Sequence, residues 1–197
     1  MEDFLTTIGY YFFRTLIKIL YFILYHPKKI NKHYIPKQGR VIIACNHIST
    51  LDPCNIITST PRQMFFLAKQ ELFKGPFSFF FKSTGCIPVN REAKSHSSTV
   101  SAIEKLNKDK IVAIFPEGRV KMEDDVVLGP LKNGFIKMAK ETNSLVVPCA
   151  IVGKYRLFFN NLKIIYSEPI DITNLSYEDA NKMLYDIIYN LIIENQN

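Results

Sequence analysis

Short apolar runs separated by helical patterns dominate the chain. Apolar, β-branched runs are typical of buried strands, and they occur at 41–45, 64–67, 111–115, 144–152 and 162–167. Apolar residues spaced three and four apart predict longer helices at 97–108, 131–141 and 176–194. A short helix is expected over 53–60, with Asp52 as its N-cap and Pro53 at its first position. Because the strands alternate with helices, the pattern favours an α/β layered fold.

The stretch 4–25 is the longest apolar segment. As a helix it would extend about 33 Å, which is enough to cross a bilayer core. However, Arg14 lies in the middle of the stretch and Lys18 follows one turn later. A cation at the bilayer centre costs roughly 2.5–3.5 kcal/mol, so a position across the membrane is disfavoured.

This stretch is also two-sided. One helical stripe is apolar and comprises Leu5, Ile8, Phe12, Leu16, Ile19 and Ile23. Another stripe is polar, cationic or aromatic and comprises Thr7, Tyr10, Arg14, Lys18, Tyr21 and Tyr25. Such a helix is expected to lie in a membrane surface, with its cations reaching lipid phosphates. A helix packed on the protein's own core would show the same amphipathy.

The positive charge is concentrated in the N-terminal half. The 197 residues carry a net charge of +7, and residues 1–94 hold 13 Lys and Arg against 5 Asp and Glu. An anionic partner is therefore expected: nucleic acid, an anionic membrane or a phosphorylated substrate. No nucleic-acid-binding motif accompanies the charge, which disfavours the first of these. Residues 26–40 are polar, contain Pro27 and Pro36 and are expected to form a connector.

The four cysteines contain no C-x-x-C pair. Neither a zinc site nor a disulfide framework is expected from them, and buried reduced thiols in a cytosolic protein fit better. The chain starts with Met-Glu-Asp, and no small-residue cleavage site follows the apolar stretch. A cleavable signal peptide is therefore not expected.

A histidine and an aspartate follow the apolar run 41–45. His47 and Asp52 supply the residue types of a general base and the carboxylate that orients it. Residues five apart on a regular helix point about 140° away from each other, so the two can meet only across a turn. The same pattern also fits an ordinary loop histidine followed by an aspartate that caps a helix.

Two further motifs follow apolar runs. Gly85 and Pro88 form a turn that leads to Arg91, a residue type suited to bidentate phosphate binding. A surface Arg paired with a neighbouring Glu is the plainer interpretation. After the run 111–115 come Glu117, Gly118 and Arg119, where glycine would let the backbone approach a ligand. An ordinary Pro-Gly turn would look alike.

Together these motifs resemble the glycerophosphate acyltransferase superfamily, and most closely its 1-acylglycerol-3-phosphate O-acyltransferases. Four blocks occur in family order over roughly residues 38–167, which is far more specific than any one motif. They are Asn46-His47-x-Ser49-x-x-Asp52, Gly85-x-Ile87-Pro88-Val89-x-Arg91, Phe115-Pro116-Glu117-Gly118 and Val147-Pro148. Leu131-Lys132-Asn133-Gly134 resembles the family's Lys-x-Gly element. The third block departs from the common F-P-E-G-T-R, because Arg119 directly follows Gly118.

The resemblance implies a central mixed sheet flanked by helices and a direct acyl transfer. His47 would be the base and Asp52 its partner, and the acceptor hydroxyl would attack the thioester of acyl-CoA or acyl-carrier protein without an acyl-enzyme. Substrate-binding residues would be Arg91, Glu117, Gly118, Asn46 and Ser49, with Arg119 and Lys69 as further cations. The implied reaction acylates the sn-2 hydroxyl of lysophosphatidic acid to phosphatidic acid, with no cofactor and no metal.

The expected organisation is a membrane-associating helix and basic connector over 1–30, followed by a catalytic domain over 31–197. The protein would sit on the cytoplasmic face of the membrane as a peripheral or monotopic enzyme. Its partners would be the lipid surface, a lysophospholipid and the acyl donor, and not nucleic acid. The run 72–81 holds five Phe, so it is expected to line an acyl groove or to dip into the membrane, unless it simply packs in the core.

Three alternatives stay open on the residues alone. The acceptor could be another lysolipid. A thioesterase or lipase would normally need an activated Ser or Cys, but no G-x-S-x-G motif occurs. Cys45 lies two positions before His47 and could share its face in an extended chain. A non-catalytic basic module that binds membranes would also account for the N-terminal charge.

Overall fold

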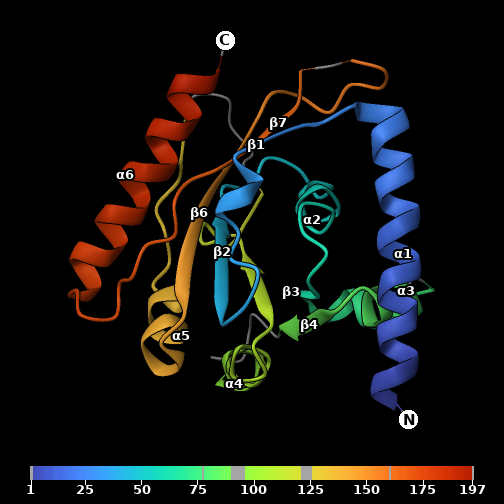
Figure 1. The fold of residues 1–197 in the computed structure, drawn as a ribbon, viewed down its shortest axis with the longest axis horizontal. Helices are drawn as coiled ribbons and strands as arrows, with labels where there is room; N and C mark the ends of the chain where they lie inside the picture. The colour runs from blue at the N-terminus through green and yellow to red at the C-terminus, as the bar shows by residue number, and fades with distance from the viewer. Residues whose placement is uncertain (1, 77, 90–95, 121–125, 160, 197) are drawn as a thin grey trace.

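The computed structural model describes residues 2–76, 78–89, 96–120, 126–159 and 161–196. Within them one mixed sheet lies between two layers of helices (Figure 1). Its strand order is β1-β7-β6-β2-β5-β3-β4, and β6 and β7 are its antiparallel neighbours. The strands are β1 Lys28–Ile30, β2 Val41–Cys45, β3 Met64–Lys69, β4 Cys86–Val89, β5 Ile111–Ile114, β6 Leu145–Val152 and β7 Lys163–Tyr166. The expected mixed α/β sheet is confirmed.

Helices cover both faces of this sheet. They are α1 Glu2–Tyr25, α2 Asp52–Ile56, α3 Ser78–Ser83, α4 His96–Asn107, α5 Gly134–Thr142 and α6 Tyr177–Asn195, with 3-10 turns η1 Lys32–Tyr34 and η2 Gln70–Phe73. Because side chains alternate along a strand, β2 feeds two cores. Ile42 and Ala44 pack with α4, α5 and α6, whereas Ile43 and Cys45 pack with α1 and α2.

The expected strands and longer helices are observed close to their expected positions, and two strands lie where none was expected. The segment 26–40, expected as a connector, contains β1, whose Lys28–Ile30 pairs in parallel with β7. The turn expected from Gly85 and Pro88 is instead largely strand β4, Cys86–Val89, at the lateral edge of the sheet. Both strands are short and interrupted by Lys or Pro, so hydrophobic alternation did not mark them.

Helix α1 packs on the domain through its aromatic stripe. Tyr10, Ile17 and Tyr21 are buried. Arg14, which was expected to reach lipid phosphates, instead donates hydrogen bonds to the carbonyl oxygens of Ile57 and Thr60. That expectation for Arg14 is wrong, because the helix turns this side chain toward the loop after α2. Its guanidinium satisfies carbonyls left open where that short helix ends.

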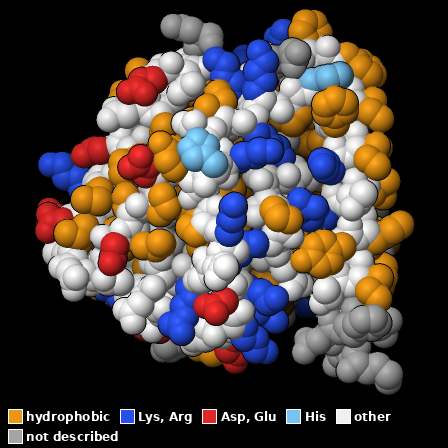
Figure 2. Space-filling view, in the orientation of Figure 1, with side chains coloured by type: hydrophobic (Ala, Val, Ile, Leu, Met, Phe, Trp, Pro, Cys, Tyr) orange, Lys and Arg blue, Asp and Glu red, His pale blue; other side chains and the backbone are white. Residues whose placement is uncertain are grey.

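The opposite side of α1 leaves large apolar side chains exposed. We call the following set the apolar margin: Ile8, Phe12, Leu16, Ile19, Phe22 and Ile23 of α1, Phe79 of α3, and Leu157, Phe158 and Phe159 of the loop after β6. Phe13 contacts Phe79, and the amide of Phe158 donates to the carbonyl of Leu24, so the three elements adjoin. Hydrophobic side chains gather along the α1 edge, on the right of the space-filling view (Figure 2).

By length and composition alone, Thr6–Tyr25 could cross a membrane. Only 17% of its most apolar window is buried in the protein. Monomeric soluble proteins rarely expose so long a contiguous apolar surface.

Candidate active site

The sheet register brings His47 and Glu117 to the same level. β2 pairs in parallel with β5, with Ala44 opposite Ile114, and His47 and Glu117 each lie three positions after this pair. Glu117 Oε1 accepts a hydrogen bond from the amide of His47 at 2.9 Å, and Oε2 accepts one from the amide of Gly129 at 2.9 Å. Glu117 therefore ties together the chain segments that follow β2 and β5. In this structure both of its oxygens are engaged by backbone.

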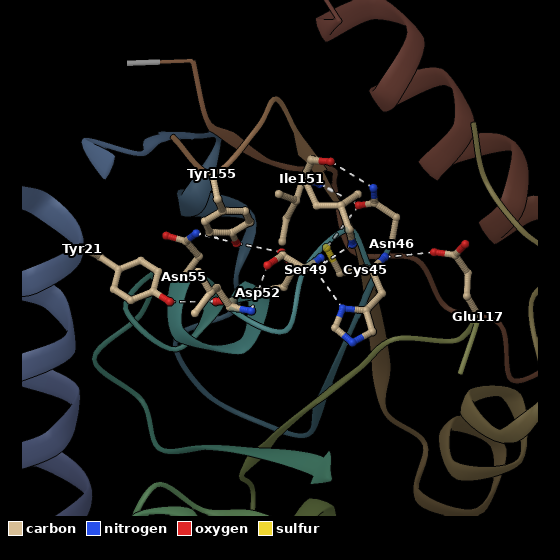
Figure 3. A network of polar contacts seen from close by, with 12 residues as sticks. Tyr21, Cys45, Asn46, Ser49, Asp52, Asn55, Glu117, Ile151 and Tyr155 are labelled. Carbon is tan, nitrogen blue, oxygen red and sulfur yellow. Dashed lines mark hydrogen bonds and ion pairs between the residues drawn. The ribbon is translucent and has the colours of Figure 1, made fainter. Parts of the chain in front are cut away.

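The chain between β2 and α2 folds back so that His47 meets Asp52. His47 Nδ1 lies 2.8 Å from Oδ2 of Asp52, across the turn that their spacing requires (Figure 3). The Asp52 side chain is fully buried. Its Oδ2 also accepts hydrogen bonds from the amides of Ile48 and Ser49, each at 2.8 Å.

The expected helix-capping role of Asp52 is wrong. The short helix α2 begins at Asp52 itself, and Leu51 occupies the N-cap without a side-chain cap. The carboxylate is turned back toward His47 and the preceding turn, where charge-assisted hydrogen bonds from two amides hold it. A capping carboxylate would face the first amides of its own helix.

These contacts assign the protonation pattern of the His47 ring. Since Asp52 Oδ2 already accepts two amide hydrogens, Nδ1 of His47 is the donor, and the unshared pair lies on Nε2. The ring stacks on Phe115, with centroids 4.0 Å apart and planes 16° apart. A fixed imidazole with an available Nε2 and a buried carboxylate behind it can act as a general base.

Two residues that sequence reasoning missed complete this network. The hydroxyl of Tyr155 donates to Asp52 Oδ1 at 2.7 Å, and Asn55 Nδ2 donates to that hydroxyl oxygen at 2.8 Å. Burial raises the pKa of Tyr155 well above its ordinary value, so the hydroxyl keeps its proton. One signal was available, because Tyr155 follows a predicted strand, where loops carry function. Its distance along the chain from Asp52 hid the pairing.

The other residues of the first block serve the backbone. Asn46 is buried, its Nδ2 donates to the carbonyl of Ile151 at 3.0 Å, and its Oδ1 accepts from the amide of Ile151 at 2.7 Å. This two-point bond joins the ends of β2 and β6. Ser49 Oγ accepts from the amide of Leu51 at 3.2 Å and so stabilises the same turn.

Two of the expected phosphate-binding cations, Lys69 and Arg119, lie at the same end of the strands as His47. Lys69 ends β3 and Arg119 follows β5, and both are exposed. Parallel strands end at one edge of a sheet, so both lie on the side of His47. Arg91 lies outside the described residues.

Gly118 and Lys132 form a close contact at this edge. Gly118 has a φ of +72°, in the left-handed region that glycine adopts without a Cβ penalty. A Cβ built there would stand 2.7 Å from Nζ of Lys132, so the ammonium lies directly over the backbone of Gly118. The amide of Lys132 also donates to the carbonyl of Pro116 at 2.9 Å. Lys132 belongs to the Lys-x-Gly element, but the sequence did not mark it as a site residue.

Among the described residues, no group of three or more His, Cys, Asp and Glu side chains is placed to hold a metal ion. All four cysteines are free thiols, and Cys45 and Cys149 are buried. The one Cys near His47 in sequence, Cys45, packs in the core beneath the sheet. Burial raises the pKa of the Cys45 thiol well above its ordinary value, which disfavours it as a nucleophile.

Known proteins are similar to this chain in sequence and in fold. Residues 26–152 match the family model described as Acyltransferase. A 1-acyl-sn-glycerol-3-phosphate acyltransferase of Bacillus subtilis (strain 168) is 29% identical and aligns over 89% of each chain. A protein of the same name from Borreliella burgdorferi is 32% identical, over 81% of this chain and 67% of its own.

The fold has a solved counterpart. The crystal structure of the 1-acyl-sn-glycerophosphate (LPA) acyltransferase PlsC from Thermotoga maritima superposes with a TM-score of 0.71 at 22% identity. The match covers 85% of this chain and 71% of that one. With the family model spanning well over half of the sequence, this chain belongs to the acyltransferase family, as a member of its 1-acylglycerol-3-phosphate acyltransferases.

Proposed function

We propose that this enzyme transfers a fatty acyl group from acyl-CoA or acyl-carrier protein to the sn-2 hydroxyl of lysophosphatidic acid, which yields phosphatidic acid. The observation that carries the proposal is the imidazole of His47, held by a buried carboxylate 2.8 Å away with Nε2 available. The names of the relatives from Bacillus subtilis and Borreliella burgdorferi support the acceptor.

The reaction needs one proton carrier and no cofactor. Nε2 of His47 takes the proton of the acceptor hydroxyl as the oxygen attacks the thioester carbonyl carbon. Collapse of the tetrahedral intermediate breaks the carbon–sulfur bond, and the imidazolium returns its proton to the leaving thiolate. Asp52 stabilises the imidazolium and keeps the tautomer, and Glu117 and Asn46 hold the backbone from which the ring projects.

A phosphate acceptor requires cations at the same edge of the sheet. Lys132 brings its ammonium over Gly118, and we assign Arg91, Lys69 and Arg119 to the same anionic group on the strength of the motif and the charge. Glu117 and Gly118 form the turn against which the acceptor phosphate would bind. Glycine suits position 118 because its φ is +72°, and a side chain there would have to move the end of the Lys132 side chain.

We further propose that the protein sits on the cytoplasmic face of a membrane through the apolar margin, as a peripheral or monotopic enzyme. Lysophosphatidic acid and its acylated product reside in lipid, so the site must meet the bilayer. The margin exposes Phe12, Phe22 and Phe158, and exposed aromatic rings are suited to the interface. The basic connector beside it, with Lys28 exposed, suits an anionic lipid surface.

The deciding assay mixes purified protein, lysophosphatidic acid and acyl-CoA or acyl-carrier protein, and follows free thiol and phosphatidic acid. We expect His47→Ala and Asp52→Asn each to lower kcat by about 100-fold or more, since general-base catalysis contributes 10²–10⁴. His33→Ala is the matched control, because His33 lies exposed on η1 and its ring contacts the ring of Tyr34.

The same assay sorts the alternatives. If His47→Ala transfers acyl groups as fast as the wild type, the mechanism is wrong. If the wild type acylates another member of a lysolipid panel in preference to lysophosphatidic acid, the proposed acceptor is wrong and the base is retained.

A further inference from the structure

The loop after β6 contacts the chain from the end of β2 to the start of α2, residues 46–52, which we call the catalytic turn. Tyr155 lies in this loop, and its hydroxyl donates to Oδ1 of Asp52 at 2.7 Å (Figure 3). The carboxylate is thereby held at both ends. Oδ2 accepts from His47 and from two amides of the preceding turn, whereas Oδ1 accepts from a residue 103 positions away.

The direction of the Tyr155 hydrogen bond is set by Asn55. The amide nitrogen of Asn55 donates to the hydroxyl oxygen of Tyr155 at 2.8 Å, so the hydroxyl directs its own proton at Asp52. Burial and the adjacent Asp52 raise the pKa of Tyr155, so the hydroxyl stays a donor throughout the working range of the enzyme. The chain from Asn55 through Tyr155 to Asp52 gives each hydroxyl and carboxylate oxygen in it a partner, which favours one arrangement, while Oδ1 of Asn55 has no partner among the described residues.

Helix α1 keeps Tyr155 in place. The ring of Tyr25 packs edge-on against that of Tyr155, with centroids 5.4 Å apart and planes at 81°. The amide of Phe158, in the same loop, donates to the carbonyl of Leu24 at 2.6 Å. One turn earlier, the hydroxyl of Tyr21 donates to the carbonyl of Leu51, immediately before Asp52. The last turns of α1 thus support both the loop and the catalytic turn.

We propose that Tyr155 is a positioning residue of the reaction, whose hydroxyl fixes the Asp52 carboxylate against His47; this rests on the proposed base role of His47. With only Oδ2 held, the carboxylate could rotate about its bond to Cβ and loosen the imidazole. Tyr155 also withdraws negative charge from Asp52, which tempers the stabilisation of the imidazolium and lets His47 return its proton to the leaving thiolate.

The test compares Tyr155→Phe in the wild-type and Asp52→Asn backgrounds. In the wild type we expect kcat to fall about tenfold, as for loss of one charge-assisted hydrogen bond, with the KM of both substrates within about twofold. The acid limb of the kcat/KM profile should move to higher pH by about half a unit, because the unshared carboxylate favours the imidazolium. In Asp52→Asn the same change should cost less than about twofold, since coupled residues are not additive.

Tyr189→Phe on α6 is the matched control, because Tyr189 is partly exposed and its ring stacks on that of Tyr185. Circular dichroism melting of each variant separates lost activity from lost fold. An equal loss in both backgrounds, or an unchanged kcat, would overturn the role of Tyr155.

An activity-independent readout keeps this proposal separate from the proposed function. The imidazole signals of His47 are followed by NMR through a pH titration, and Tyr155→Phe should move their midpoint upward while Tyr189→Phe leaves it in place. If the wild type acylates no lysolipid but the midpoint moves, only the proposed function fails. If the midpoint stays, the positioning role is wrong whatever the activity.

Discussion

Asp52 shows how much of the site depends on single side chains. Its carboxylate joins the imidazole of His47, two amides of the turn and the hydroxyl of Tyr155, all in a fully buried position. A buried carboxylate without such partners would be strongly destabilising. Glu117 and Asn46 play a comparable part for the backbone. Glu117 accepts from the amide of His47, which follows the neighbouring strand β2, and Asn46 accepts from the amide of Ile151 in the neighbouring strand β6. Proton transfer is assigned to the imidazole of His47, and the residues around it fix the position of this ring.

At this scale Lys132 carries a prediction for substrate binding. Lys132→Met keeps the length of the side chain and removes the charge over Gly118. We expect the KM for lysophosphatidic acid to rise about tenfold, as for loss of one charged phosphate contact, with kcat little changed. Steady-state kinetics with varied acceptor measures it. Lys137→Met is the control, because Lys137 lies on α5 and pairs with Glu141 on the surface. A KM that rises equally in both variants would show that the effect is general surface charge.

At the scale of elements, α1, α3 and the loop after β6 act together. Within the Phe-rich run 72–81, one phenylalanine packs inward and another is exposed. Phe80 packs on Phe13 of α1 and partly in the core, whereas Phe79 is 70% exposed at the apolar margin. Phe158 is equally exposed in a loop hydrogen-bonded to Leu24. This arrangement favours membrane contact over core packing for Phe79.

Vesicle flotation tests this surface. Phe79→Ser and Phe158→Ser should each weaken binding to anionic vesicles by about tenfold or more, since burying a Phe contributes about 1.5–3 kcal/mol. Met183→Ser, an exposed apolar residue of α6 away from the margin, should leave binding unchanged. If all three variants bind like the wild type, the apolar margin does not contact the membrane.

At the scale of the whole molecule, α1 and β1 are joined to the domain by polar as well as apolar contacts. β1 adds an edge strand beside β7, and Lys29 of this strand turns inward to contact the hydroxyl of Thr58. Burial, together with the nearby charges of Arg14 and Lys32, lowers the pKa of Lys29 to about 7. Attachment of the N-terminal segment therefore buries the amino group of Lys29, and this burial disfavours its charged form.

This charge makes stability depend on pH. Between the lowered pKa of Lys29 in the folded chain, about 7, and its ordinary value of 10.5, the unfolded chain binds a proton that the folded chain gives up. The free energy of unfolding should therefore rise with pH across this window, by up to about 1.4 kcal/mol per unit. Lys29→Met should raise the Tm at pH 7, and the gain should shrink toward pH 10.

Thermal unfolding at several pH values measures the effect. Lys28→Met serves as the control, since Lys28 lies exposed on the same strand. If Lys29→Met raises the Tm by the same amount at every pH, the pKa of Lys29 is not lowered in the folded chain.

The hydrophobic pattern determined most of the architecture by itself. Buried strands and the longer helices carry enough apolar residues in the right period to be recognised locally, and the motifs after 41–45 and 111–115 marked His47, Asp52 and Glu117. The five-residue spacing even required the turn that joins His47 to Asp52. These features are properties of short stretches of chain, which is why the sequence sufficed for them.

Only the tertiary structure decided which distant residues complete the site and which way α1 faces. Tyr155 meets Asp52 because β6 lies beside β2 in the sheet, an adjacency that no local pattern encodes. Lys132 lies over Gly118 because the segment before α5 returns to the end of β5, where the amide of Lys132 donates to the carbonyl of Pro116. The two stripes of α1 were visible in the sequence, but only the structure shows which one faces the domain. Tyr10 and Tyr21 are buried, and Arg14 and Tyr21 donate hydrogen bonds to carbonyls of the domain, whereas Lys18 of the same stripe is exposed. The apolar stripe therefore faces outward.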